Sequence, residues 1–383
     1  MKDEKITDLA AYVRALKAGE SMDVVIEDDA PLTLERWSDV EKWESPQDPW
    51  LVNHLIPREG ITILASISGS GKSFLTMHLA KCIAEGAPLF GYSDLYVRQA
   101  RVLYINLEMA KSEFKRRGER LGMYEHENLL FINALDDFNL NRADDEDTKY
   151  KQLMTLIYEA DIQVVIVDTF RAAAGGLKED KAEEVRAFFQ KFLILKNSGV
   201  SVVFTEHLRK PTHLEGKKPK KEQLLGSQDK TANVEVLLMI AKDESSGDIQ
   251  VYQRKNRIAP EIQPFSVRMT DTKDSSGREM ISFEYLGNVD DEATKKDEGK
   301  GLILNLLVGG AHMTRKEIVQ QIGRQVGDKN IRAALGELTA SGEIDFVKRG
   351  KAHLFFTTPI GETGENSSKN GTLNNLGDYF DTS

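Results

Sequence analysis

The chain has 383 residues, of which 40% are hydrophobic and 29% are charged, and this length predicts two or three domains of a globular protein. Its single cysteine, Cys82, excludes an intramolecular disulfide and a cysteine-rich zinc site, and it favours a reducing cytoplasm. The formal net charge of −10 excludes a polycation, so any contact with nucleic acid has to come from local basic segments.

Residues 1–48 form an acidic N-terminal extension. Its first residues, MKDEKITDLAAYVRALKAGE, carry charges throughout and lack the apolar core of a signal peptide. No run in the chain approaches the roughly 18 apolar residues of a membrane span. We therefore expect a cytoplasmic protein without a membrane segment. Trp37, Trp43 and Trp50 predict either a hydrophobic brace against the next domain or a contact with a neighbouring subunit.

Residues 49–288 alternate between short apolar runs and longer amphipathic runs. The apolar runs predict strands at 60–66, 101–107, 129–135, 162–168 and 200–206. Val-, Ile- and Leu-rich runs separated by helices are typical of a parallel sheet that is covered on both faces. Beyond residue 230, two Ser-Gly turns between apolar runs predict β-hairpins. The predicted fold class is α/β, with a mostly parallel sheet extended by antiparallel strands.

A second, smaller domain is predicted after a charged linker at residues 289–299. Residues 300–358 predict three helices and a strand pair with a basic tip, and Thr314 and Glu317 predict a capping box on the second helix. This order is that of an α+β winged-helix domain. The Gly-, Ser- and Asn-rich residues 359–383 predict a disordered tail.

The segment SISGSGKSFL, residues 66–75, has the pattern of a phosphate-binding loop between a strand and a helix. Such a loop needs glycines for its turn, backbone N–H groups aimed at phosphates, a lysine and a hydroxyl for magnesium. Ser66 replaces the first glycine of the pattern, but it lies where the strand ends, so we expect the site to tolerate it. The predicted nucleotide contacts are Ser68, Gly69, Ser70, Gly71, Lys72, Ser73 and Phe74.

Three carboxylates end predicted strands. Asp168 follows an apolar run, where it can join Ser73 in holding magnesium. Glu108 and Glu206 compete for the role of orienting the attacking water. We favour Glu108, because the strand after the phosphate-loop helix often lies beside the magnesium-binding strand. The alternative is that Glu108 is only a charge at the start of a helix.

The ordered motifs resemble those of the RepA-like hexameric helicases, which are RecA-fold P-loop ATPases related to the DnaB replicative helicases. The motifs are ASISGSGKS, YINLEM, VVIVDTF, TEHLRK, GSQDKTANVEVLLMI and QRKNR. The resemblance covers roughly residues 48–270. It implies ATP and Mg²⁺ as ligands, with Lys72 and Ser73 on the phosphates and the metal. It also implies Glu108 as the catalytic carboxylate and Asp168 as a group that assists the metal.

The same resemblance implies residues that act beyond the phosphate loop. His207 is expected to sense the γ-phosphate and to couple hydrolysis to the loop that follows it. Lys255 and Arg257 are expected to reach the neighbouring subunit's site as a finger in trans, which makes a ring necessary for full activity. The alternative for this pair is a solvated charge cluster on a hairpin. Ser66, the N-terminal extension and the winged helix depart from the minimal helicase.

Two regions predict contacts with nucleic acid. The loop after His207 is rich in basic residues and faces the DNA-binding axis of the ring in the resembled fold, which suits phosphate contacts without sequence preference. Residues 169–181 predict a second such loop. In the winged helix, the third helix and the strand tip suit base and phosphate contacts. The residues are Arg209, Lys210, Lys217, Lys218, Lys220, Lys221, Lys329, Arg332, Lys348 and Arg349.

The sequence therefore predicts a ring-forming, hexameric ATP-dependent motor that acts on single-stranded DNA. Its place in the replication of a mobile element rests on family analogy alone. One alternative is an ATP-gated DNA-binding initiator or regulator that unwinds nothing. Another is an ATPase scaffold that docks a protein partner through the winged helix or the tail.

Overall fold

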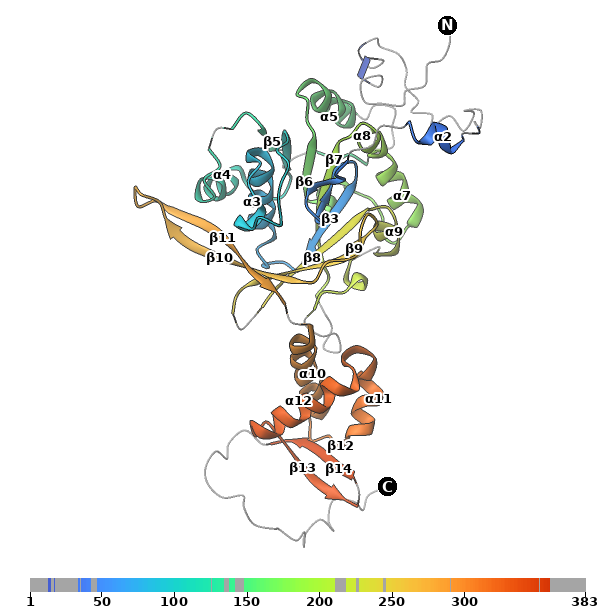
Figure 1. The fold of residues 1–383 in the computed structure, drawn as a ribbon, viewed down its shortest axis with the longest axis vertical. Helices are drawn as coiled ribbons and strands as arrows, with labels where there is room; N and C mark the ends of the chain where they lie inside the picture. Colours follow the sequence, from blue (N-terminus) through green and yellow to red (C-terminus); the bar gives the residue numbers. More distant parts are fainter. Residues whose placement is uncertain are drawn as a thin grey trace. The chain divides into compact units, whose positions relative to one another are not determined.

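In the computed structural model, the chain folds into two compact units, residues 1–291 and residues 292–383 (Figure 1). The residues that the structure describes are 13, 14, 17, 34, 36–42, 47–124, 126–133, 138–141, 148–210, 218–224, 227–243, 246–289, 291–350 and 352–358. The predicted tail, 359–383, most of the N-terminal extension and the candidate Lys217 lie outside these ranges.

The larger unit is built on a nine-stranded sheet with the order β11-β10-β9-β8-β3-β7-β6-β4-β5. Its strands are β3 (Ile61–Ser66), β4 (Val102–Asn106), β5 (Leu129–Asn133), β6 (Val164–Asp168), β7 (Ser201–His207), β8 (Val236–Lys242), β9 (Ile249–Asn256), β10 (Phe265–Lys273) and β11 (Glu279–Asn288). The six strands from β8 to β5 in this order are parallel, and β9, β10 and β11 continue the sheet in antiparallel fashion. The predicted mostly parallel sheet with an antiparallel extension is confirmed.

Helices cover both faces of this sheet (Figure 1). They are α2 (Trp37–Val40), α3 (Lys72–Glu85), α4 (Lys111–Arg120), α5 (Thr148–Glu159), α6 (Phe170–Ala173), α7 (Ala182–Gln190), α8 (Leu193–Asn197) and α9 (Ser227–Ala232), with short 3₁₀ turns at Leu89–Gly91 and Lys221–Gln223. Helices α3 and α4 pack on one face, and α5, α7 and α8 pack on the other. The chain between β6 and β7 ends in two helices, because α7 and α8 are separated around Lys191 and Phe192.

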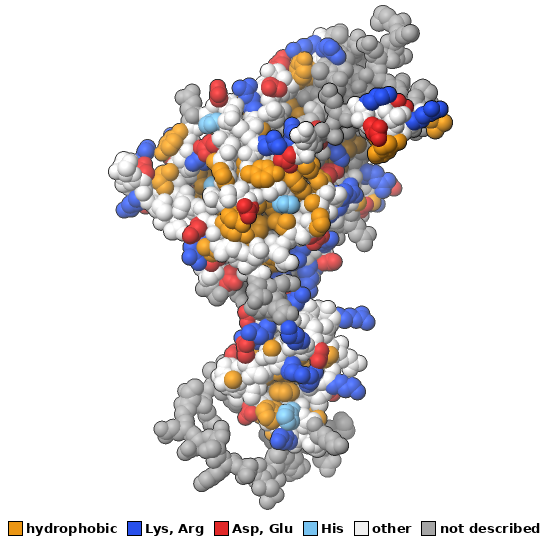
Figure 2. Space-filling model, in the orientation of Figure 1, with side chains coloured by type: hydrophobic (Ala, Val, Ile, Leu, Met, Phe, Trp, Pro, Cys, Tyr) orange, Lys and Arg blue, Asp and Glu red, His pale blue; other side chains and the backbone are white. Residues whose placement is uncertain are grey.

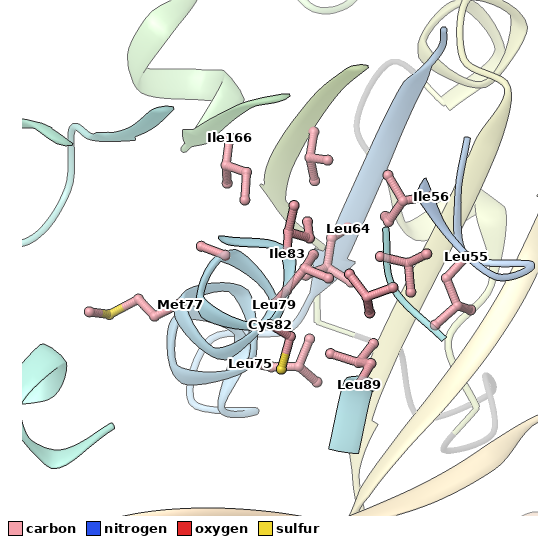
Figure 3. Packing of buried hydrophobic residues seen from close by; sticks show 14 of the residues in the cluster. Leu55, Ile56, Leu64, Leu75, Met77, Leu79, Cys82, Ile83, Leu89 and Ile166 are labelled. Atoms are coloured by element: carbon pink, nitrogen blue, oxygen red, sulfur yellow. The ribbon is translucent and has the colours of Figure 1, made fainter. Parts of the chain in front are cut away.

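Buried apolar side chains fix α3 against the central strand β3. Figure 3 shows Leu64 of β3 and Leu79 and Ile83 of α3 in one packed cluster. Each is at most 4% exposed, and full burial of such a side chain contributes about 1.5–3 kcal/mol. This packing holds the first turn of α3 at the carboxyl end of β3, which places the predicted phosphate loop.

A two-stranded sheet of β1 (Trp50–Val52) and β2 (Ile56–Pro57) extends the core of the larger unit. Trp50 is buried there, as expected for a hydrophobic brace, whereas Trp37 on α2 is 73% exposed. Trp43 lies outside the described residues. Within the described part of the chain, no helix combines the length and the apolar character that a membrane crossing requires.

The smaller unit contains three helices and a three-stranded sheet with the order β12-β14-β13. Its elements are α10 (Asp291–Leu307), β12 (Met313–Thr314), α11 (Arg315–Val326), α12 (Asp328–Ala340), β13 (Ile344–Arg349) and β14 (Ala352–Thr357). The predicted capping box is present, since Thr314 Oγ1 accepts the Glu317 N–H and Glu317 accepts the Thr314 N–H. Apolar residues of all three helices and of both long strands form its own core.

The predicted linker at 289–299 is wrong for most of its length, because α10 begins at Asp291. The segment contains two Glu and two Lys residues, which favour helix, beside three Asp residues, which do not. Lys296 and Lys300 lie one turn apart on α10, and both pair with Glu337 of α12. These contacts give the charged segment a packing partner, which its composition alone does not indicate.

Candidate nucleotide-binding site

The loop between β3 and α3 turns through two glycines in the left-handed region. Gly69 and Gly71 both have φ of 83°, a conformation that costs other residues about 1–2 kcal/mol. A Cβ on Gly71 would lie 3.0 Å from Ile249 Cδ1, so a larger residue here would also require the Ile249 side chain to shift. Ser66 is the last residue of β3 and is fully buried, which agrees with its expected place at the strand end.

The loop delivers the first turn of α3 to a pocket of about 480 Å³. All seven predicted nucleotide contacts line this pocket, from Ser68 to Phe74. No side chain caps α3, and its first turn carries no acidic residue. The unpaired N–H groups and the helix dipole therefore form an anion-binding terminus.

The Lys72 ammonium is held over the carboxyl ends of the central strands. Its Nζ lies 3.4 Å from Asp168 Oδ1 and 3.2 Å from Thr205 Oγ1, which it can reach as a donor. Thr205 Oγ1 donates to the same Asp168 oxygen at 2.5 Å, and Tyr104 donates to Asp168 Oδ2 at 2.7 Å. Burial and the negative charge of Asp168 raise the pKa of Tyr104, so it stays a hydrogen-bond donor.

Asp168 is fully buried and both of its oxygens already accept hydrogen bonds. It does not line the pocket, in contrast to Ser73. With this arrangement, Asp168 would act on a magnesium ion through an intervening water. Ser73 lines the pocket and offers a hydroxyl that can bind the ion directly.

Glu108 and His207 meet at the pocket wall. His207 Nε2 lies 3.3 Å from Glu108 Oε1 and 3.4 Å from Oε2, and both residues line the pocket. The hydrogen bond from His207 lowers the pKa of the Glu108 carboxyl against the opposing effect of burial, and the charge of Lys72 lowers it further. Glu108 is therefore an ionised, half-exposed carboxylate beside the phosphate loop, as a group that orients water must be.

Glu206, the competing carboxylate, is placed differently. It is 2% exposed and does not line the pocket. One of its oxygens accepts the His207 N–H at 2.8 Å, and the other accepts Lys230 Nζ at 2.7 Å. A carboxylate with this surrounding has a structural role, so the geometry favours Glu108.

Several pocket residues are not indicated by any sequence motif. Arg117 of α4 lines the pocket, lies 4.8 Å above the Phe74 ring and donates to Glu113 at 2.6 Å. Nothing local distinguishes it from Arg116 and Arg120 on the same helix. The rim is completed by Lys242 at the end of β8, Gly247 in the turn that follows, Ile249 of β9 and Met269 of β10. These contacts depend on how the hairpins fold back over the loop.

Lys255 and Arg257 do not approach the phosphate loop of their own chain. Lys255 pairs with Leu237 near the start of β8, and the phosphate loop lies beyond the other end of that strand. Lys255 donates to the Thr231 carbonyl and Arg257 donates to the Ala232 carbonyl, at the end of α9. Burial and the neighbouring Arg257 charge lower the pKa of Lys255 to about 8.

The predicted nucleic-acid residues lie in separate places. Arg209 and Lys210 follow β7 directly, and an isolated bridge between Leu208 and Leu224 closes the base of the loop. Lys218, Lys220 and Lys221 lie on the returning side of that loop. In the smaller unit, Lys329, Arg332, Lys348 and Arg349 are exposed at the start of α12 and the end of β13. Figure 2 shows Lys and Arg side chains on the visible face of this unit.

The residues of the pocket fit a nucleoside triphosphate with magnesium. The pocket has the volume of a small-molecule site, a cationic floor at Lys72 and an uncapped helix terminus. Ser66 Oγ is buried in this pocket without a hydrogen-bond partner among the described residues. The described residues contain no cluster of three His, Cys, Asp or Glu side chains for a metal. This suits magnesium, which is usually bound by few protein groups together with phosphates and waters.

Comparison with known families supports the same assignment. Residues 27–213 match the family model described as an AAA domain. This match, together with the large, mostly parallel sheet, supports a P-loop ATPase of the AAA type with a RecA-like core, and hence nucleotide binding and hydrolysis. No curated protein matches the chain.

Proposed function

We propose that this ATPase is a hexameric ring motor of the RepA-like helicase type, which acts on single-stranded DNA in replication. The observation that carries the proposal is the continuity of the chain from the pocket to a basic loop. Glu108 contacts His207, and His207 is the last residue of the strand that runs into Arg209 and Lys210. A change in the pocket therefore has a direct route to the candidate DNA contacts.

The chemistry proposed for the pocket is attack of water on the γ-phosphate. Lys72 and the N–H groups of the first turn of α3 would bind the phosphates. Glu108, kept ionised by His207, would orient and polarise the water. Magnesium, held by Ser73, would neutralise charge that develops on the phosphate oxygens. His207 would then change its contact with Glu108 as the γ-phosphate leaves.

The ring proposal is supported by the position of Lys255 and Arg257. The pair lies at the end of the sheet that is remote from its own phosphate loop, where it cannot serve its own pocket. A neighbouring subunit packed against this end would receive both cations. An arginine supplied in trans stabilises charge on the transferring phosphoryl group.

The test measures the DNA-stimulated ATP turnover and the salt dependence of DNA binding of a variant in the basic loop. A triple Lys218→Gln, Lys220→Gln, Lys221→Gln variant should lose most of the stimulation of ATP turnover by single-stranded DNA. Removal of three phosphate contacts should lower the salt slope of binding by about 2, from roughly 0.7 per contact. Wild-type stimulation and salt slope in the triple variant would contradict the proposed DNA contact.

A second candidate function has its own observation. Lys329 and Arg332 at the start of α12 and Lys348 and Arg349 at the end of β13 are exposed in one small unit. A winged helix with this charge would suit an ATP-gated DNA-binding regulator. Lys348→Gln with Arg349→Gln would then abolish DNA binding, and DNA would leave ATP turnover unchanged in the wild type.

A further inference from the structure

Lys230 of α9 is a fully buried cation that the proposed chemistry does not use. Its side chain is 0% exposed. Its Nζ donates to Glu206 Oε2 at 2.7 Å and to Glu179 Oε2 at 2.8 Å, and it lies 4.2 Å from the centre of the Phe170 ring. A lysine leaves water only where such partners replace its hydration.

The partners of Lys230 belong to two different segments of the chain. Glu206 is near the end of β7, directly before His207. Phe170 and Glu179 belong to the segment that follows Asp168 at the end of β6. Lys230 therefore joins the end of β7, from which one candidate DNA-binding loop leaves, to Phe170 at the start and Glu179 near the end of the other loop. The two loops leave the sheet from neighbouring parallel strands.

The same cluster fixes the backbone of His207. Glu206 uses its two oxygens in two directions, because Oε2 accepts Lys230 and Oε1 accepts the His207 N–H at 2.8 Å. The base of the following loop is closed nearby, where Arg209 N–H donates to the Gln223 carbonyl at 2.9 Å. A displacement of α9 would therefore move Glu206 through Lys230, and Glu206 would in turn move the backbone of His207.

The last two residues of α9 contact the two cations that were proposed to act in the neighbouring subunit's site. Lys255 and Arg257 donate to the carbonyls of Thr231 and Ala232, the two residues that follow Lys230. One short helix therefore contacts the carboxylate beside His207 at Lys230 and the candidate finger pair at its end.

We propose that Lys230 is a positioning residue that holds His207, the loop 169–181 and the base of the loop after β7, residues 208–210 and 218–224, as one unit. Removal of its charge would free the loops from the strand ends, so that a change at the Glu108–His207 contact would no longer move them together. The coupling role rests on the proposed function, whereas the holding of the loops rests on the contacts of Lys230 alone.

The first measurement is amide hydrogen exchange of the full-length, nucleotide-free protein. Lys230→Met keeps an unbranched apolar stem and removes the charge. Exchange in segments 169–181, 206–210 and 218–224 should rise together by roughly 10-fold, as expected for local opening, while β8 and β9 keep wild-type rates. The second measurement is the stimulation of ATP turnover by single-stranded DNA, which should fall by a similar factor.

The chain offers a matched control at the other end of the sheet. Lys196 Nζ donates to Glu235 Oε1 at 2.5 Å, and Glu235 Oε2 accepts the Ile61 N–H at 2.7 Å. Lys196→Met therefore removes a cation from the same kind of Lys–Glu–amide arrangement, and it should leave both loops and the stimulation unchanged. If Lys230→Met fails to fold, the double variant Lys230→Met, Glu206→Gln is used in both measurements instead. It also removes the charge of Glu206 that Lys230→Met alone would leave unpaired beside His207.

The outcomes separate this inference from the proposed function. Loosening of both loops with loss of stimulation, in a Lys230 variant only, supports it. Wild-type exchange in both loops, equal loosening by Lys196→Met, or loose loops with full stimulation would overturn it. A wild-type protein without ATP turnover or DNA stimulation would refute the proposed motor and the coupling role, and exchange would still decide whether Lys230 holds the loops.

Discussion

His78 on α3 should make the larger unit less stable as the pH falls from 7 to 5. Its ring stacks on Phe283 at 4.5 Å and on Phe90 at 5.6 Å between centroids. Burial, with a smaller effect from the charge of Lys81, lowers the pKa of His78 from 6.5 to about 4. Between these values the unfolded chain binds a proton that the folded protein does not, so the free energy of unfolding falls as the solution is acidified.

The size of this effect follows from the two pKa values. A shift of about 2.5 units corresponds to at most about 3.4 kcal/mol, of which about 2 kcal/mol is lost between pH 7 and pH 5. His78→Phe cannot titrate and keeps the stacking partners. Its unfolding free energy should therefore change less over this interval than that of the wild type, by about 2 kcal/mol.

The assay is urea unfolding at pH 7 and pH 5, followed by tryptophan fluorescence. All three tryptophans lie between residues 37 and 50, and Trp50 is buried in the same core cluster as the residues around His78. The signal therefore reports the larger unit. Titration of other groups cancels in the comparison between the two proteins. An identical pH dependence for wild type and His78→Phe would refute the reasoning.

Three further predictions concern the nucleotide site. Gly71→Ala should weaken ATP binding more than Gly69→Ala, because both residues have φ of 83° but only a Cβ at Gly71 meets another side chain; equal affinities by calorimetry would contradict this. Glu108→Gln should keep ATP binding and lower turnover by about 10²–10⁴-fold, while Glu206→Gln keeps measurable turnover; the reverse order would show that Glu206 is the catalytic carboxylate. Mixing Arg257→Ala with Lys72→Ala subunits should recover part of the ATPase activity through shared interfaces, and no recovery at any ratio would count against a finger in trans.

The sequence predicts the central sheet and the phosphate loop well, because both depend on local patterns. The buried Val- and Ile-rich runs can only be strands covered on both faces, and the loop glycines stand between such a strand and a helix. The sequence favours Glu108 on the expectation that the strand before it lies beside the strand that ends at Asp168. In the structure, β4 does pair with β6.

Other features depend on contacts between distant segments, which local patterns do not contain. Lys296 and Lys300 of α10 both pair with Glu337 of α12, a contact that the charged sequence of this segment does not indicate. The approach of Arg117 to the pocket depends on how α4 packs, and its neighbours in sequence have the same chemistry. The burial of Lys230 could not be predicted either, because its two carboxylate partners lie 24 and 51 residues away.

The most direct test of the central claim is the ATPase rate of the full chain with and without single-stranded DNA, measured alongside particle mass in ATP. The proposed motor predicts that DNA stimulates turnover and that the mass corresponds to six copies of the chain. A monomer whose turnover is indifferent to DNA would contradict it.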